Sequence, residues 1–589
     1  MKQFFKFMFA SMLGFFLTWL IIVIIMISIF ATAITFSKNN KTEISNNSLL
    51  YLKLDQPIED RAANNPFSNF SSFSNKKAIG LNEIIKCIKA AKSDKKIKGI
   101  FLELNDVPSG IATVEEIRNA LLDFKTSKKF IISYSEGYSQ KAYYLATTSD
   151  EIILNPEGIL AFGGIGARLM FFKGSLEKLE IEPEVIRHGK FKSAVEPFTL
   201  DKMSDANREQ TKEFVSTIWN TILKGISETR KISTEELNLI ADSLKLSNAN
   251  NALKYKMIDA IMYKDEVLAK INEKLKVDKN SKIKLISINS YLQSPHVISS
   301  VERNTKYDKI TVIYASGDII TGEGGDDNIG SEKFSNVIRE ARLDKKVKAV
   351  VLRINSPGGS ALASEIIWRE IELTKKIKPV VVSMGNVAAS GGYYIACPAN
   401  KIIAQPNTIT GSIGVFGILF NTKKFMNNKL GITFDNVNTN AYSDIGSPYR
   451  PISNFEKMKI QNEVERIYDV FLEHVAEGRK LTKVQVDSIG QGRVWSGVDA
   501  KKIGLIDDFG DLQKAIEIAA DLAKLKNYRI QTLPKQKEAF EQIMELLNSS
   551  AETKIMKNEL GEYYKYMQNM KSILSMDKIQ ARMPFMEIE

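Results

Sequence analysis

The hydrophobic positions of this chain form one long run at the N-terminus, followed by many short apolar segments. The run from Phe7 to Phe36 contains 30 residues without a charged side chain. Roughly 20 apolar residues in a helix cross the hydrocarbon core of a bilayer, so this segment is long enough to span a membrane. The alternative is a cleaved signal peptide, because Ala31-Thr32-Ala33 resembles a cleavage site. The apolar part of such a peptide covers only about 7–15 residues, so we expect an uncleaved signal anchor.

Polar segments flank this anchor. Residues 1–6 are expected to form a cytoplasmic tip, and residues 37–48 a linker to the body of the protein. Two lysines stand on each side of the apolar run, which gives only a weak positive-inside signal. We expect the large C-terminal body to lie outside the cytoplasm, and its low cysteine content is compatible with that place. A second polar linker is expected at residues 64–75.

The rest of the chain alternates short β-rich runs with amphipathic helices. Strands are expected at residues 100–104, 129–134, 350–354 and 379–384. Helices are expected at residues 113–124 and 361–375 and after Ser453, the first and last of them opened by a capping box such as Thr113 with Glu116. Strands separated by helices of this length indicate right-handed βαβ units and a mainly parallel sheet.

This pattern occurs twice, at an offset of nearly 250 residues. The matching segments are residues 94–100 and 344–350, 143–146 and 393–396, 230–233 and 479–482, and 257–259 and 505–507. A series of matches at one spacing predicts two copies of a single domain, which we place at residues 49–290 and 308–530. The predicted fold class is therefore α/β, duplicated. Residues 531–589 have no counterpart in the first copy, and we expect a helical, Met-rich tail there.

Composition narrows the function classes. A chain that is 44% hydrophobic and 25% charged is neither disordered nor collagen-like. Two cysteines cannot form a disulfide framework. The chain also has only three histidines and no HExxH motif, so it offers too few soft ligands for an array of zinc fingers. The net charge of +12 is spread over scattered lysine runs without interleaved aromatic residues. We therefore expect no metal, no other cofactor and no nucleic-acid partner.

A glycine-rich loop at residues 355–360 is the first candidate for chemistry. It follows the predicted strand at 350–354 and contains Pro357-Gly358-Gly359. Paired glycines allow backbone N–H groups to approach a ligand, and the helix that follows favours negative charge. This arrangement suits an oxyanion hole. A loop of this kind is also commonly no more than a turn.

Ser390 is the second candidate. It stands among small residues at 388–392, just ahead of a predicted helix, where its Oγ would be exposed. A serine in this position is more often an N-cap. The first copy, however, has Gln140 at the equivalent position, and residues 105–110 replace the glycine loop. The repeat keeps its framework and changes these residues, as expected if one copy alone holds a nucleophile.

Ser412 lies in a third loop, the glycine-bounded segment at residues 410–414. The first copy has the apolar Phe162 at the corresponding position.

A serine nucleophile also needs a base. The first copy offers Lys192, which aligns with Tyr442 of the second copy at the same spacing. A lysine acts as a general base only if burial lowers its pKa, and an apolar cleft between the two copies could do so. His188 is the alternative base, and spacing leaves a Ser–His pair open.

Taken together, these segments resemble the signal peptide peptidase A (protease IV) family in its long, tandem-repeat form. The motifs that carry the resemblance lie at residues 138–146, 191–198, 355–359, 383–385, 389–392 and 410–414. The family implies ClpP/crotonase-like domains and a Ser/Lys dyad. By motif, the resemblance makes Ser390 the nucleophile and Lys192 the general base, with Ser412 orienting the lysine amine.

The same resemblance implies the remaining features of the site and its setting. The N–H groups of Gly358 and Gly391 would form the oxyanion hole, with Gly359 as the alternative to Gly358. The family forms homo-oligomers, commonly tetramers, which face outward from the inner membrane and degrade spent signal peptides. Such an enzyme is a serine endopeptidase that passes through an acyl-enzyme.

Two other functions remain open from the sequence. A crotonase-type acyl-CoA enzyme shares the βαβ framework and an oxyanion hole built from backbone N–H groups, but it needs neither Ser390 nor a membrane anchor. A catalytically inactive membrane scaffold would use the repeat for assembly alone. The presence of Ser390, Lys192 and Ser412 in one chain argues against the scaffold.

Overall fold

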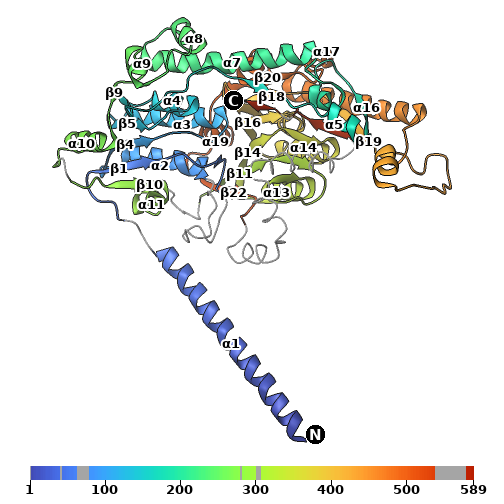
Figure 1. Ribbon diagram of the computed structural model, residues 1–589, viewed down its shortest axis with the longest axis horizontal. Coiled ribbons are helices and arrows are strands. Elements are labelled where there is room, and N and C mark those ends of the chain that lie inside the picture. The colour runs from blue at the N-terminus through green and yellow to red at the C-terminus, as the bar shows by residue number, and fades with distance from the viewer. Residues whose placement is uncertain are drawn as a thin grey trace.

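A long N-terminal helix projects away from a large α/β body (Figure 1). The computed structural model describes residues 2–39, 43–62, 79–278, 281–299, 307–536, 579–584 and 586–588. Helix α1 (Lys2–Asn39) contains an apolar stretch, Gln3–Ile25, whose mean hydropathy is 2.5 and which no part of the body covers. One apolar helix of this length is consistent with a membrane anchor. The helix also includes most of the predicted tip, and the predicted linker at 64–75 lies outside the described residues.

The first copy is built on a six-stranded sheet in which all strands are parallel. Its order is β10 (Leu285–Ser287), β1 (Ser48–Leu52), β4 (Ile97–Glu103), β5 (Phe130–Ser135), β6 (Glu151–Leu154), β9 (Ala260–Ile261). Its helices are α2 (Leu81–Ser93), α3 (Ile111–Lys125), α4 (Gln140–Ala146), α5 (Lys173–Lys178), α6 (Glu196–Thr199), α7 (Asp205–Arg230), α8 (Thr234–Asp242), α9 (Ala249–Lys254), α10 (Lys264–Lys274), α11 (Ile288–Leu292) and α12 (Pro295–Ser299). A short parallel pair, β2 (Ile58–Glu59) and β3 (Ile79–Gly80), precedes α2.

The second copy repeats this plan. Its sheet runs β20 (Val494–Ser496), β18 (Ile409–Gly411), β16 (Val380–Ala389), β14 (Val347–Ser356), β11 (Lys309–Ser316), β22 (Arg529–Leu533), with β17 (Lys401–Ala404) beside β16 and β21 (Asp508–Phe509) beside β17. Its helices are α13 (Ser331–Leu343), α14 (Ala361–Lys375), α15 (Gly391–Ala396), α16 (Asn454–Arg479), α17 (Lys483–Ile489), α18 (Gly497–Lys502) and α19 (Leu512–Leu522). Within the described part of this sheet, β20 alone is antiparallel to its neighbour.

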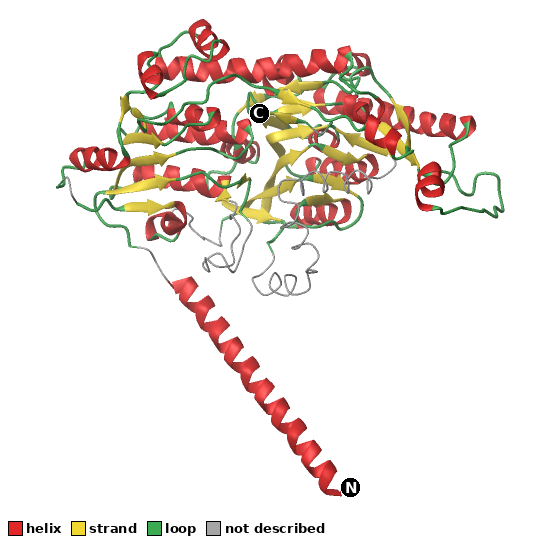
Figure 2. Ribbon diagram, viewed as in Figure 1, coloured by secondary structure: helices red, strands yellow, loops and turns green. Residues whose placement is uncertain are grey.

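The predicted duplication and fold class are confirmed. Helices α7 and α16 have 26 residues each, and each ends at a lysine with positive φ, Lys231 at +59° and Lys480 at +56°. Helices cover both faces of each sheet, which explains why the strands carry nearly continuous apolar runs (Figure 2). Helix α10 covers one face of the first sheet, and α19 covers the matching face of the second.

A third sheet joins the two copies, which the sequence pattern did not predict. Its order is β13 (Asn328–Gly330), β12 (Asp318–Ile320), β15 (Gly358–Ser360), β23 (Ile579–Arg582), β19 (Phe416–Asn421), β8 (Glu182–Arg187). Strand β8 belongs to the first copy and pairs antiparallel with β19 of the second. This pairing brings the segment that follows β8, including Lys192, onto the second copy.

The prediction of a helical tail is wrong for the described residues at its end. Residues 537–578 lie outside the described part of the chain. Beyond them, β23 lies between β15 and β19, and β24 (Glu587–Ile588) pairs with β7 (Ala167–Arg168). Strands β15 and β19 each present backbone hydrogen-bonding groups toward the space between them, and an extended segment pairs with both at once. A helix could not do so.

A buried ion cluster also links the copies. Arg353 of β14 contacts Asp60 at 2.7 Å and Glu116 of α3 at 2.7 Å, and all three side chains are almost fully buried. Burial raises the pKa of Glu116 to about 7, because desolvation outweighs the attraction of Arg353. The predicted capping box at Thr113 is therefore wrong. Helix α3 begins earlier, after Gly110, and Glu116 faces the core instead of the helix end.

Replacement of Arg353 by Met is expected to cost about 3–5 kcal/mol of unfolding free energy, because two buried carboxyl groups would lose their cation. Urea unfolding of the detergent-solubilised chain measures this loss. The matched control is Arg466→Met, because Arg466 pairs with Glu463 on the surface of α16. The control should cost less than about 1 kcal/mol. Equal losses in the two variants would contradict a linking role for the cluster.

Candidate active site

Ser390 lies at the sharp turn between β16 and α15. Its backbone adopts φ +54° and ψ −114°, a conformation that non-glycine residues rarely hold unless the surroundings impose it. The Ser390 N–H donates to the Gly411 carbonyl at 2.8 Å, which fixes the turn to β18. The side chain is fully buried and does not cap α15. The hydroxyl is therefore turned away from the helix and toward the space between the copies.

Lys192 approaches this turn from the first copy. The β8–β19 pairing brings its loop against the second copy, where the neighbouring Phe191 N–H donates to the Gln491 carbonyl at 2.9 Å. A β-carbon at Gly492, whose φ is +79°, would lie 2.6 Å from the Lys192 backbone. Gly414 lines the path of the side chain, since a β-carbon there would lie 3.2 Å from Lys192 Cδ. The aliphatic part of Lys192 thus occupies a narrow channel, which side chains at Gly414 and Gly492 would obstruct.

The amine of Lys192 ends among three oxygen atoms. Its Nζ lies 2.8 Å from Ser390 Oγ, 3.1 Å from Ser412 Oγ and 3.1 Å from the Ser412 carbonyl oxygen. All three residues are fully buried. Desolvation lowers the pKa of Lys192 well below its usual value of 10.5. The structure therefore brings the predicted serine, lysine and orienting serine together within one chain.

His188, the alternative base, faces elsewhere. Its ring stacks on Tyr468 with the centroids 4.0 Å apart, and its Nδ1 lies 2.5 Å from Glu465 Oε2. Both partners belong to α16. The basic side chain that lies within hydrogen-bonding distance of Ser390 is therefore Lys192, not His188.

The predicted oxyanion-hole glycines border the same turn. Gly358 adopts φ +102°, and a β-carbon there would lie 2.7 Å from the Gly391 nitrogen. Only glycine lets the loop approach the start of α15 this closely. The Gly358 N–H donates to Ser356 Oγ at 3.2 Å. Gly359 is next in the chain and pairs with β23.

The C-terminal strand crosses this site. In the β15–β23 ladder Gly359 stands opposite Ala581, which is fully buried. The Ala581 carbonyl oxygen lies 2.2 Å, and the Gly391 nitrogen 2.7 Å, from the point where a β-carbon of Gly358 would stand. An extended peptide segment therefore passes directly beside the glycines that border Ser390.

Gln210 is a positioning residue that sequence reasoning missed. From α7, its Nε2 donates to the Phe191 carbonyl at 3.1 Å and to Ser193 Oγ at 3.0 Å, on either side of Lys192. Its Oε1 accepts from the Val494 N–H at 3.1 Å, which ties this loop to the second copy. The sequence places a glutamine on the buried face of a helix, which is the one signal for this role. That signal does not identify hydrogen-bond partners as distant in sequence as Val494.

Comparison with known proteins adds independent findings. The family model for peptidase family S49 matches residues 123–278 and 372–526, one match in each copy. The chain is 38% identical over 481 residues to Protease 4 of Salmonella typhi, covering 80% of this chain and 76% of the relative. It is 36% identical over 516 residues to Protease 4 of Haemophilus influenzae, covering 83% and 82%. It is 34% identical over 493 residues to the chloroplastic serine protease SPPA of Arabidopsis thaliana, covering 81% and 69%.

Solved structures give lower similarity. A ClpP1 mutant from Listeria monocytogenes is 16% identical, with a TM-score of 0.24, and covers 35% of this chain and 94% of its own. A mutant of the membrane-bound stomatin-specific protease 1510-N is 18% identical, with a TM-score of 0.26, and covers 39% and 99%. The family match in both copies and the long matches to Protease 4 and SPPA decide the assignment. The chain belongs to peptidase family S49 and is a serine-type peptidase.

Proposed function

We propose that this protein is a membrane-anchored serine endopeptidase in which Ser390 is the nucleophile and Lys192 the general base. The observation that carries the proposal is the 2.8 Å separation between Lys192 Nζ and Ser390 Oγ in a site where both side chains are fully buried. Burial lowers the pKa of the Lys192 amine well below its usual value, so this amine loses its proton more readily than a solvated lysine and can then accept one.

The contacts of Lys192 suit a neutral amine. Such an amine has two N–H groups, which donate to the carbonyl and the Oγ of Ser412. Its lone pair is then directed at the Ser390 hydroxyl. Ser412 thereby fixes the rotation of the amine, which is the positioning role expected for it.

The reaction proceeds through an acyl-enzyme. Lys192 takes the Ser390 proton as Oγ attacks the peptide carbonyl carbon, and the resulting ammonium then gives that proton to the departing amine as the C–N bond breaks. A water next loses a proton to Lys192 and attacks the ester carbon. Cleavage of the ester returns the proton from Lys192 to Ser390 and releases the new carboxylic acid, which ionises in solution.

The oxyanion of each tetrahedral intermediate needs two N–H donors. We assign these donors to Gly391 and to Gly359, the alternative to Gly358. The Gly358 N–H already donates to Ser356 Oγ, whereas Gly359 stands opposite Ala581 in the ladder with the C-terminal strand. A substrate strand in that slot would present its carbonyl to Gly359 and Gly391.

Neither of the two alternative functions, an acyl-CoA enzyme or an inactive scaffold, accounts for the contacts between Lys192, Ser390 and Ser412. An acyl-CoA enzyme of the crotonase type has no use for a lysine amine buried against a serine. A scaffold would have no reason to retain Ser390 in a strained backbone conformation with its hydroxyl turned away from the helix that it precedes.

The anchor and the slot support a proposal for the substrates and the location. We propose spent signal peptides as substrates, the inner membrane as the location, and the extracytoplasmic side for the catalytic body. Spent signal peptides are apolar segments within the membrane, where an enzyme held by one apolar helix would meet them. The slot between β15 and β19 accepts an extended chain, and an unfolded peptide can adopt that form.

We also propose that the protein forms a homo-oligomer, specifically a tetramer. The loop between β19 and α16 projects from the body (Figure 1). It exposes large apolar side chains at Leu430, Ile432, Val437, Tyr442 and Ile445. Apolar groups gathered on a projecting loop are typical of contacts between subunits.

Ser390→Ala and Lys192→Ala are each expected to lower peptide hydrolysis by at least about 10⁴-fold, because the nucleophile and its base act as one unit. Lys192→Met should lose as much, although it keeps the apolar stem in its channel. His188→Ala should keep most of the activity, since its ring is paired with α16. Hydrolysis of casein and of a synthetic signal peptide measures the effect. Full activity in Lys192→Ala would contradict the dyad.

The pH profile should also report Lys192. Its pKa in the folded protein is lowered, and its neutral form is the active one, so kcat/KM should fall as the pH drops through that pKa. The acidic limb should therefore lie well below 10.5, the usual value for lysine. Lys192→Arg should be inactive at every pH, because a guanidinium keeps its proton. A limb near 10.5 would contradict the role of desolvation.

A further inference from the structure

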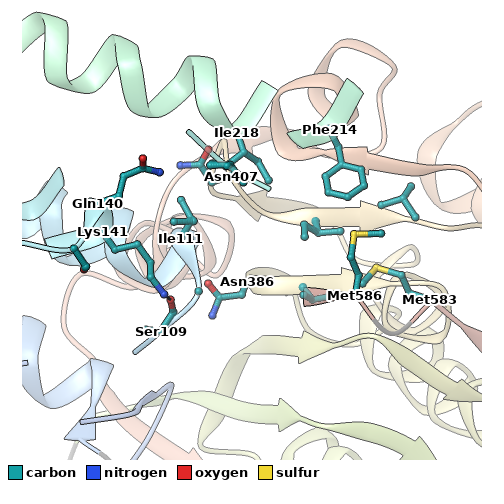
Figure 3. A pocket seen from close by; sticks show the side chains of 16 residues that line it. Ser109, Ile111, Gln140, Lys141, Phe214, Ile218, Asn386, Asn407, Met583 and Met586 are labelled. Carbon is teal, nitrogen blue, oxygen red and sulfur yellow. Dashed lines mark hydrogen bonds between the residues drawn. The ribbon is translucent and has the colours of Figure 1, made fainter. Parts of the chain in front are cut away.

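A cavity of about 360 Å³ lies between the two copies (Figure 3). This volume is within the size range of pockets that bind ligands. Most of its wall is apolar and comes from both copies and from the C-terminal segment: Ile111, Phe214, Ile218, Ile409, Val494 and Met583. In Figure 3, Gln140 and Lys141 lie on the side of the cavity opposite Met583 and Met586. The cavity therefore suits an apolar ligand that has one polar end.

The polar side of the cavity belongs to the first copy, at positions that correspond to the catalytic loops of the second. Gln140, which lines the cavity, stands where the second copy has Ser390. Two hydrogen bonds of 3.1 Å join its side chain to the backbone of Gly164. This part of the first copy is therefore an ordered surface without a nucleophile.

Lys141 and Ser109 occupy the positions of the two proposed oxyanion-hole donors. At the offset of 250 residues, Lys141 corresponds to Gly391 and Ser109 to Gly359. The Lys141 Nζ donates to the Ser109 carbonyl at 3.0 Å, and both residues line the cavity. Among the described residues that line it, Lys141 alone is charged and none is acidic. Where the second copy has N–H groups for a transient oxyanion, the first copy thus has a cation, which suits a ligand with a permanent negative charge.

Asn407 adds an unmet hydrogen-bonding capacity to the wall. The residue is 3% exposed and lines the cavity, yet within the described part of the chain neither its Nδ2 nor its Oδ1 has a hydrogen-bond partner. The buried Oγ of Ser109 has no partner there either. Unpaired buried polar groups cost free energy, which a ligand recovers by pairing with them. A ligand that satisfies the Asn407 amide must both accept and donate a hydrogen bond, as a peptide main chain does and a fatty acid carboxylate does not.

The cavity lies close to the candidate nucleophile. Val387 of β16 and Ile409 of β18 line it, and the same two strands lead directly to Ser390 and Ser412. Three residues of extended chain cover about 10 Å. A peptide held in the cavity therefore needs only a short further stretch to reach Ser390.

We propose that this cavity binds the free C-terminus of an apolar peptide. The Lys141 ammonium pairs with the terminal carboxylate, the Asn407 amide pairs with the adjoining main chain, and the apolar wall accepts the last side chains. The proposal rests on the proposed function, because it takes the bound peptide to be the substrate, whose preceding residues reach Ser390. It makes the preferred substrate a peptide that an earlier cleavage has already released, since such a peptide carries a free carboxylate next to its apolar residues.

Binding of labelled peptides to the full-length Ser390→Ala chain in lipid nanodiscs tests this proposal without hydrolysis, with protein-free nanodiscs as the background. The first probe is a short peptide of alternating leucine and alanine, with a dye at its N-terminus and a free C-terminal carboxylate. The second probe is the same peptide with a C-terminal amide. Fluorescence anisotropy should give a Kd at least about 10-fold higher for the amide probe, because the amide offers no charge to Lys141.

Lys141→Met, which keeps an apolar stem of similar length, should raise the Kd of the carboxylate probe to that of the amide probe. Lys89→Met, at an exposed lysine of α2, should leave both Kd values unchanged. Asn407→Leu should weaken binding of both probes about 10-fold and keep the ratio between them, because a leucine cannot pair with the main chain.

Equal Kd values for the two probes, or a preference for the carboxylate that persists in Lys141→Met, would overturn the proposal. Displacement of the carboxylate probe by dodecanoate as readily as by the unlabelled peptide would assign the cavity to a fatty acid and overturn the proposal as well. The comparison of the two probes uses the unsubstituted cavity, so it does not depend on the folding of a variant. Absence of hydrolysis in the wild type would instead overturn the proposed function, because binding is measured without it.

Discussion

The desolvation of one lysine is the constraint on which the rest of this structure depends. Among the residues that the structure describes, no carboxylate contacts the Lys192 amine, whose hydrogen-bond partners are oxygen atoms of Ser390 and Ser412. A protonated amine is costly in such a place, so the surroundings favour its neutral form. The glycines along its path and the hydrogen bonds of Gln210 keep the side chain extended toward the serine. We regard the junction between the copies as the part of the protein that makes this lysine a base.

The duplication divides the site between the two copies. One copy supplies the lysine through β8 and its loop, and the other supplies the serine, the glycines and the orienting hydroxyl. The equivalent positions of the first copy, such as Gln140, line a cavity that Met583 and Met586 also border. The buried cluster around Arg353 connects the same two copies. The proposed catalysis therefore requires the two copies to remain in contact.

Much of the fold and of the candidate site could be predicted from the sequence, for physical reasons. Apolar periodicity and a constant offset revealed the duplicated α/β fold, because both copies bury the same faces. Differences between the copies singled out Ser390, Lys192 and Ser412, which the structure brings together. The β8–β19 pairing, the place of the C-terminal strand and the role of Gln210 were beyond such reasoning. They depend on contacts between segments distant in sequence, which periodicity does not encode. The capping pattern at Thr113 misled because burial of Glu116 against Arg353 outweighs a local helix-end preference.

The central claim is that the neutral amine of Lys192 activates Ser390. The most direct test is covalent labelling of the wild type and of Lys192→Ala with a fluorophosphonate, with the modified residue identified by mass spectrometry. We expect the wild type to be labelled at Ser390, and labelling of Lys192→Ala to be nearly abolished. Labelling of Ser390 at an equal rate in both proteins, or modification of a different serine, would contradict the account.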